Sequence, residues 1–186
     1  MLALLTSYEK DDRLLRLGKL LMGEGWDLLG SAGTSRFLNE NSVACRDVAE
    51  IVGKPILGHR VVTLSRELHA ALLSRPEDGD ELARLRIEPI DLVYVTLYPL
   101  EKTIKRGASA AEVLEQTDIG GPTLLRAAAK GRRIALSSPD QIDEFEKRLS
   151  SESLDDQYRV ALAAAAERAV ARYVAKSADY WERQTR

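Results

Sequence analysis

Ile90-Asp91-Leu92-Val93-Tyr94-Val95-Thr96-Leu97-Tyr98 is the stretch of sequence that decides the fold. It is apolar almost throughout and rich in β-branched and aromatic residues, which favour strands. A strand with one face in water would alternate apolar and polar residues, and this stretch does not. Such a run is typical of a parallel strand that helices cover on both faces. We therefore expect residues 90–98 to form a central strand of a parallel sheet.

Shorter strands alternate with helices on both sides of this stretch. Apolar runs predict further strands at residues 2–6, 26–30, 43–48 and 134–136. Leucine spacing and capping patterns predict helices near residues 14–21, 37–38 and 64–73, after Ser109 and Ser138, and from Ser153 onward. Asp11 or Asp12 can cap the first of these helices. This alternation predicts the α/β class, with a parallel sheet and right-handed crossovers.

Composition and charge exclude several classes of protein. The 186 residues have a formal net charge of −2 with dispersed lysines and arginines, so nucleic acid is a poor candidate partner. The single cysteine, Cys45, cannot form an internal disulfide and fits a reducing cytoplasm. We expect no signal peptide, because a basic region and a cleavage site are lacking. We also expect no membrane span, because no apolar stretch approaches about 18 residues.

Four loops follow the predicted strands, where ligands bind in open parallel sheets. They contain Lys10, the turn Ser31-Ala32-Gly33-Thr34, residues 96–98, and Asp118-Ile119-Gly120-Gly121-Pro122-Thr123. The serine-containing turn offers backbone N–H groups and two hydroxyls to a phosphate, although a helix cap alone would also explain it. The paired glycines allow a ligand to approach the backbone closely, although a tight turn is the simpler explanation. Lys10 by itself is more often a solvated surface charge than a ligand-binding residue.

Taken together, these segments resemble a known family. Residues 118–130, Asp-Ile-Gly-Gly-Pro-Thr-Leu-Leu-Arg-Ala-Ala-Ala-Lys, are similar to the signature of the IMP cyclohydrolase domain of bifunctional purine-biosynthesis enzymes. Glu88 to Val93, Leu97-Tyr98-Pro99, the Ser31–Thr34 turn and Gly58 to Leu64 also match family segments, with substitutions. The resemblance implies a methylglyoxal-synthase-like α/β domain at residues 1–150 and a C-terminal helical extension at 151–186. It also implies that the transformylase domain that normally follows is missing here.

The resemblance further implies an activity, a ligand and a set of site residues. The family closes the second purine ring: a carboxamide nitrogen attacks a formyl carbon, and water leaves to give IMP. The implied ligand is a purine-type ribonucleoside monophosphate, with no metal or organic cofactor, and the family usually works as a homodimer. A cytoplasmic location is expected from the single cysteine, and a separate formyltransferase is one candidate source of the formylated substrate. The residues implied to bind the substrate, chiefly its phosphate, are Lys10, Ser31, Gly33, Thr34, Arg60 and Thr63. Further residues implied to line the substrate site are Ala32, Val61, Val62, Val95 and Thr96. Asp118, Ile119 and Gly120 would face the base, and Tyr98, Asp118 and Lys130 would serve the proton transfers.

Several positions depart from the family pattern around the base and the formyl group. Val62 stands where the family has a lysine that is usually assigned to the chemistry. Arg66 could restore the positive charge, but an arginine is a poor proton shuttle. His59 and His69 lack the spacing of a metal site. We therefore expect altered base recognition or weakened catalysis.

Three functions remain open from the sequence. The first is cyclisation of a formamido-imidazole carboxamide ribonucleotide, or of a close analogue in a specialised purine-analogue pathway. The second is a catalytically degenerate module that binds purine nucleotides. The third, a methylglyoxal-synthase-type lyase, fits least well, because that branch lacks the signature at residues 118–130.

Overall fold

Five parallel strands form one sheet in the computed structural model, which describes residues 1–58 and 60–185. The strands are β1 (Leu2–Ser7), β2 (Asp27–Gly30), β3 (Arg46–Asp47), β4 (Leu92–Thr96) and β5 (Ile134–Leu136). Their order across the sheet is β3-β2-β1-β4-β5. The chain therefore adds β2 and β3 on one side of β1, and then returns to add β4 and β5 on the other side. This confirms the predicted α/β class.

The stretch that decided the fold is strand β4, buried on both faces as expected. It lies between β1 and β5, with Leu4 opposite Val93 and Val93 opposite Ala135. The structure corrects one detail, because β1 and not β4 is the middle strand of the five. Alternate residues of the strands face two separate apolar layers: Tyr94 packs in one, and Val93 and Val95 pack in the other.

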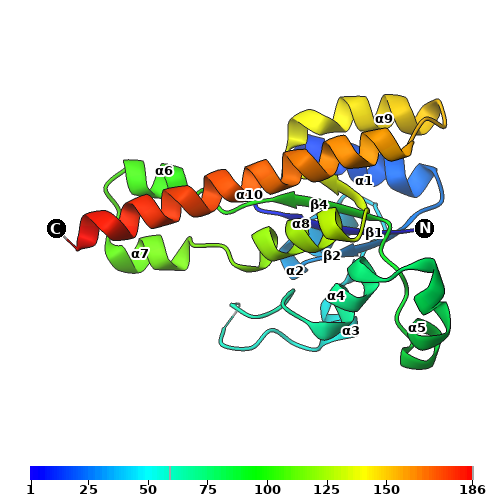
Figure 1. The fold of residues 1–186 in the computed structure, drawn as a ribbon, viewed down its shortest axis with the longest axis horizontal. Helices are drawn as coiled ribbons and strands as arrows, with labels where there is room; N and C mark the ends of the chain where they lie inside the picture. The colour runs from blue at the N-terminus through cyan, green and yellow to red at the C-terminus, as the bar shows by residue number, and fades with distance from the viewer. Residues whose placement is uncertain (59, 186) are drawn as a thin grey trace.

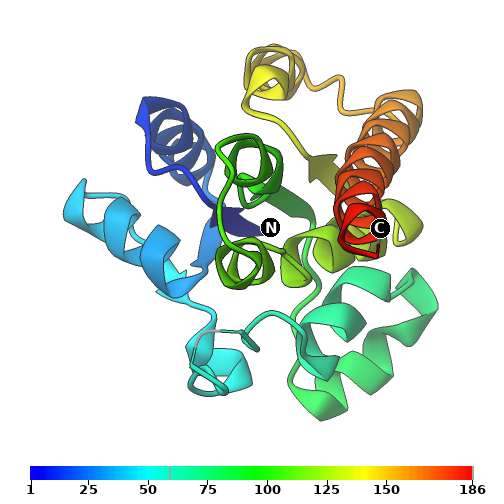
Figure 2. The same ribbon diagram turned by 90° about the vertical axis from the view of Figure 1, so that its left-hand side faces the viewer.

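Helices cover both faces of the sheet (Figures 1 and 2). The helices whose residues pack on the Tyr94 side are α1 (Asp12–Gly23), α2 (Ala32–Glu40), α9 (Ile142–Ser150) and the start of α10 (Asp156–Gln184). The helices whose residues pack on the Val93 side are α4 (Arg66–Leu73), α8 (Gly120–Lys130) and the middle of α10. The remaining short elements are α3 (Ala49–Val52), η1 (Pro76–Asp78), α5 (Gly79–Leu85), α6 (Leu100–Lys105), α7 (Ala110–Glu115) and η2 (Pro139–Gln141).

The third predicted strand is much shorter than expected. Residues 43–48 were expected to pair along their length, but only Arg46 and Asp47 join β2. The reason is a side chain: the Asn39 amide donates to the Cys45 carbonyl (2.8 Å) and accepts from the Cys45 N–H (3.1 Å). The backbone of Cys45 is therefore satisfied by α2 before the strand begins.

Local capping signals predicted several helix ends correctly. Asp11 caps α1, and its carboxylate accepts from the Leu14 N–H (3.0 Å). Ser109 and Glu112 form the predicted capping box of α7. Ser138 forms the other predicted box, although the element that it opens is the short 3-10 helix η2, which leads into α9.

The C-terminal helix α10 lies along the body of the molecule and reaches past the end of the sheet (Figure 1). Its buried contacts with the two apolar layers are Tyr158, Leu162, Ala166 and Val170. Val160 and Val174 of the same helix are about half exposed. The predicted domain boundary at residue 150 falls between α9 and α10. Of the described helices, none is long and apolar enough to cross a membrane.

Candidate functional site

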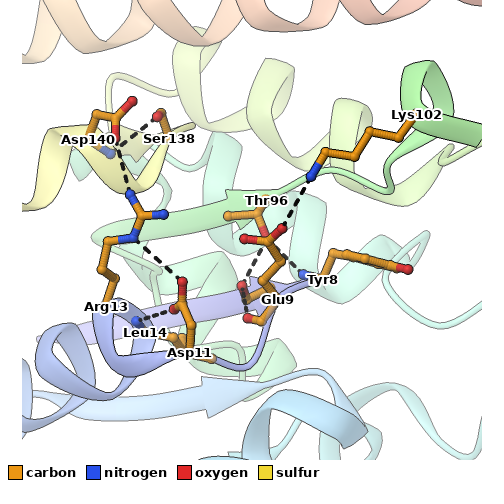
Figure 3. Close-up of polar contacts among 10 residues, drawn as sticks. Tyr8, Glu9, Asp11, Arg13, Leu14, Thr96, Lys102, Ser138 and Asp140 are labelled. Carbon is orange, nitrogen blue, oxygen red and sulfur yellow. Dashed lines mark hydrogen bonds and ion pairs between the residues drawn. The ribbon is translucent and has the colours of Figure 1, made fainter. Parts of the chain in front are cut away.

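The carboxyl ends of β1 and β4 meet where the sheet reverses its building direction, which is where open α/β sheets bind ligands. Hydroxyl groups join the two strands at this point. The Ser7 and Thr96 hydroxyls are hydrogen-bonded (2.8 Å), and Thr96 Oγ1 also accepts from the Tyr8 N–H (2.7 Å). Figure 3 shows the loop that follows β1, where Glu9 pairs with Lys102 of α6 (3.9 Å). Thr96 thus holds the switch point together, which leaves its hydroxyl less free for a substrate.

The predicted phosphate turn forms the uncapped start of α2. Ser31 occupies the N-cap position, but its hydroxyl donates to Thr34 Oγ1 (3.1 Å) and caps no backbone N–H. The first-turn N–H groups of an α-helix have no partner within the helix, and they attract anions together with the helix dipole. The Thr34 side chain is fully buried and accepts from the Ser7 N–H (3.1 Å). Thr34 therefore offers a phosphate its backbone N–H, whereas its hydroxyl fastens α2 to β1.

Lys10 lies against this turn. A side chain on Gly33 would come within 3.8 Å of the Lys10 ammonium. The ammonium is turned inward, where it donates to the carbonyls of Ser7 and Tyr8. Partial burial lowers the pKa of Lys10 from its ordinary value. The structure therefore brings Lys10, Ser31, Ala32 and Gly33 together as a cationic and N–H-rich cradle.

Asp118 is the acidic group of the site, in the loop between α7 and α8. Its Oδ1 accepts from the Gly121 N–H (2.8 Å), which fixes the carboxylate at the start of α8. Burial raises the pKa of Asp118 above its usual range, and backbone N–H groups of Gly121, Tyr98 and Gly120 partly oppose this effect. A carboxylate with a raised pKa is a better proton acceptor near neutral pH than an ordinary one.

Tyr98 lies beside this carboxylate. Its ring packs against Tyr8, with centroids 5.4 Å apart. Burial, followed by the negative charge of Asp118, raises the pKa of Tyr98. Its phenol therefore stays protonated at neutral pH and can donate a proton or a hydrogen bond.

The loop before α4 carries a second group of predicted residues, of which Thr63 reaches the start of α8. Ile56 and Val61 pair through both backbone hydrogen bonds (3.1 and 3.3 Å), and Arg60 lies at the exposed tip. Thr63 lies directly over Gly120, where any side chain would collide with the Thr63 hydroxyl. Val62 packs against the apolar layer on the Val93 side. His59 lies outside the described residues.

Lys130 is not brought to the other predicted residues within one chain. It is the exposed last residue of α8, whereas Asp118 precedes the first turn of that helix. An α-helix rises 1.5 Å per residue, so the two ends of α8 are about 15 Å apart. The helix leads directly to β5, whose first residue pairs with the first residue of β4. Lys130 therefore lies at the amino-terminal edge of the sheet, opposite the cradle, and a single chain does not bring it to Asp118, with which it was expected to share the proton transfers.

The remaining predicted residues are distributed as follows. Val95 is buried in the apolar layer, so only its backbone faces the site edge. Ile119 is 59% exposed beside Asp118. Arg66 pairs with Glu67 (3.3 Å) and its side chain is 80% exposed, which places its charge in solvent. His69 bonds through Nδ1 to the Ser65 carbonyl (2.7 Å). Within the described part of the chain, no group of three or more His, Cys, Asp or Glu side chains could hold a metal ion.

Two residues of the site were missed by the sequence. Ser7 ends β1 with a buried hydroxyl that contacts Thr96, and a polar residue closing an apolar run was the available signal. Tyr173 of α10 contacts the backbone of Asp118 and Gln116. No local pattern connects residues that lie 55 positions apart.

Comparisons with known proteins identify the relatives of this chain. The model of the MGS-like domain family matches residues 13–123. The chain is 38% identical over 178 residues to the bifunctional purine biosynthesis protein PurH of Oenococcus oeni, covering 92% of this chain and 35% of that protein. It is 37% identical over 169 residues to PurH of Aquifex aeolicus, covering 88% and 33%. The chain thus spans about a third of the length of these relatives.

A solved structure is similar over nearly the whole chain. The crystal structure of ForH superposes with a TM-score of 0.83 and 31% identity, covering 97% of this chain and 98% of that one. The expected methylglyoxal-synthase-like fold with a C-terminal helix is therefore confirmed, as is the similarity to the purine-biosynthesis proteins.

Proposed function

We propose that this chain, which belongs to the MGS-like domain family, is a cyclohydrolase that closes the six-membered ring of a purine or a purine analogue. The substrate would be a formamido-imidazole carboxamide ribonucleotide, and the product IMP or its analogue. Similarity to PurH supports a role of the cyclohydrolase kind. The observation that carries the proposal is the pairing, at one sheet edge, of an anion cradle with a carboxylate of raised pKa.

The cradle would bind the 5′-phosphate of the ribonucleotide. The ammonium of Lys10 and the N–H groups of Ala32, Gly33 and Thr34 supply positive charge and donors in one place. Arg60 and Thr63, on the loop that covers the start of α8, would contact the same ligand from the opposite side. This division would leave the Asp118–Gly120 segment for the base.

Asp118 and Tyr98 would move the protons of the ring closure. The carboxamide nitrogen attacks the formyl carbon, and the new carbon–nitrogen bond converts the formyl oxygen to a hydroxyl. That oxygen leaves as water, with one hydrogen from the carboxamide nitrogen and one from the formamido nitrogen. The Asp118 carboxylate would accept a proton from nitrogen, and the Tyr98 phenol would donate to the formyl oxygen as negative charge develops on it. No cofactor is required for this balance.

The valine at position 62 supports one of two differences from the family: a different substrate, or a lower rate on the usual formylated ribonucleotide. Together with Leu97 it packs against the apolar layer on the Val93 side, so an apolar side chain stands where the resemblance implies a lysine. Val62→Lys tests the reason. A rise in turnover on the usual formylated ribonucleotide would mean a weakened cyclohydrolase. A fall in turnover on an analogue would mean that Val62 accommodates another base.

The assembly and the supply of substrate are also proposals. We infer a homodimer that works in the cytoplasm, with a separate formyltransferase as the source of the formyl group. Light scattering at micromolar concentration tests the first point, and a mass near the 20.6 kDa of one chain would count against it.

The direct test is to incubate the protein with the formylated ribonucleotide and to follow product formation by absorbance. Calorimetry with IMP and with inosine should show preference for the phosphate. If the protein binds the monophosphate but cyclises no formamido-carboxamide ribonucleotide, it is a nucleotide-binding module and the catalytic proposal fails.

A further inference from the structure

The loop that carries Asp118 is tied to the C-terminal helix by one phenol. Tyr173 of α10 accepts a hydrogen bond from the Asp118 N–H (2.8 Å) and donates one to the Gln116 carbonyl (3.0 Å). A single oxygen atom thus holds two backbone groups of the α7–α8 loop at a fixed separation. The Asp118 side chain is fixed from the other direction by the Gly121 N–H (2.8 Å).

Tyr173 is itself firmly anchored. Its ring packs against a small apolar cluster whose buried members are Leu100, Val113 and Tyr180, from α6, α7 and α10. Figure 1 shows this end of α10 alongside α6 and α7, beyond the sheet. Tyr98 lies just before α6, and Asp118 lies just after α7. The cluster therefore supports the segments that carry both proposed proton-transfer groups.

The double hydrogen bond needs a protonated phenol, because only then can the oxygen donate as well as accept. Burial raises the pKa of Tyr173 to about 12. Both hydrogen bonds therefore persist throughout the neutral pH range, and Tyr173 acts through its position and not through a change of protonation.

We propose that Tyr173 is a positioning residue of the cyclohydrolase site, which sets the place of Asp118 relative to the substrate through the backbone of residues 116–118. This inference rests on the proposed function in one respect, the role of Asp118 in proton transfer. It makes the far end of α10 part of the site. Displacing a reacting group by about 1 Å can cost about 100-fold in rate, so a loosened loop should slow the chemistry.

Tyr173→Phe removes the hydroxyl and keeps the ring in the cluster. We expect kcat to fall by about 10- to 100-fold while KM and the melting temperature stay close to their wild-type values. Tyr180→Phe is the matched control, because it removes a phenol hydroxyl from the same helix and the same cluster, outside the 116–118 loop. Equal kcat for wild type and Tyr173→Phe would overturn the proposal, as would an equal loss in both variants.

Amide exchange separates this inference from the proposed function. Loss of one hydrogen bond, worth about 0.5–1.5 kcal/mol, should speed exchange of the Asp118 N–H by about 2- to 12-fold in Tyr173→Phe and leave it unchanged in Tyr180→Phe. If the wild type cyclises no substrate, the proposed function fails, and this exchange result alone decides whether Tyr173 positions the loop. Unchanged exchange of the Asp118 N–H in Tyr173→Phe would show that the Tyr173 hydroxyl does not hold this loop.

Discussion

Asp118→Asn is the sharpest test of the proposed chemistry. The amide oxygen can still accept from the Gly121 N–H, which now lies 2.8 Å from Oδ1, so the loop should keep its place. The substitution removes the ability to take up a proton, and it also replaces one accepting oxygen with an NH2 group that cannot accept from the Tyr98 or Gly120 N–H. Loss of a general base lowers rates by about 10²- to 10⁴-fold, which corresponds to about 2.7–5.4 kcal/mol of transition-state stabilisation. We therefore expect kcat to fall within this range while the affinity for the nucleoside monophosphate hardly changes.

The assay is the initial rate of ring closure at saturating formylated ribonucleotide, with affinity measured separately by calorimetry. Asp140→Asn is the control, because its carboxylate is 85% exposed and pairs with Arg13 away from the cradle. Turnover of Asp118→Asn within about tenfold of the wild type would refute a general-base role, since base catalysis contributes at least about 100-fold.

The pH dependence of the wild type gives a second measure of the same group. Because burial raises the pKa of Asp118 and the ionised form is the active one, kcat/KM should fall as the pH drops through a value above the ordinary aspartate range. This acid limb should be missing in Asp118→Asn. Stability changes in the opposite direction: because the folded pKa is raised, the folded state loses stability as pH rises from the unfolded to the folded pKa. Asp118→Asn should remove that loss.

Three further substitutions test other parts of the structure. Lys10→Ala should weaken monophosphate binding by about 1.5–3 kcal/mol in calorimetry, because a charge-assisted contact is lost, and should leave inosine binding unchanged. Arg133→Ala should lower the free energy of unfolding in urea by about 1.5–3 kcal/mol, since its guanidinium donates to the carbonyls of Ala71, Leu72 and Ser74. Arg132→Ala is the control, because it removes only an exposed ion pair and should lower the free energy of unfolding by less than about 1 kcal/mol. Lys130→Ala should leave turnover nearly unchanged, because α8 holds this residue at the far edge of the sheet; a loss of about 100-fold or more would mean that a second chain supplies the lysine.

The sequence predicted the features that depend on neighbours in the chain. The capping pattern at Ser109 and Glu112 is local, so it survives in the structure unchanged. The apolar run around Val93 predicted a strand buried on both faces, because only a covered strand can bury every side chain. The short third strand could not be predicted in the same way. Its extent depends on Asn39, which uses its side chain to satisfy backbone groups of another segment.

Strand ends bring some of the predicted site residues together, whereas a helix separates others. Lys10 and Gly33 follow neighbouring parallel strands, whose carboxyl ends share one edge. Lys130 was placed with Asp118 because the two belong to one sequence signature. A continuous helix between them cannot bend back, so closeness in the signature did not become closeness in space.

The cradle and the loop that carries Val62 are held in different ways, and this difference bears on the effect of Val62→Lys. The cradle is fastened to the sheet, because Thr34 and Ser7 bond each other inside the fold and Ser7 also bonds Thr96. A change there would disturb the switch point as well as the ligand. The loop of Val62 is held by the Ile56–Val61 pair and by packing against α8, outside the sheet. Val62 is only partly buried where it packs against the apolar layer, so we expect Val62→Lys to change ligand binding or turnover more than the fold.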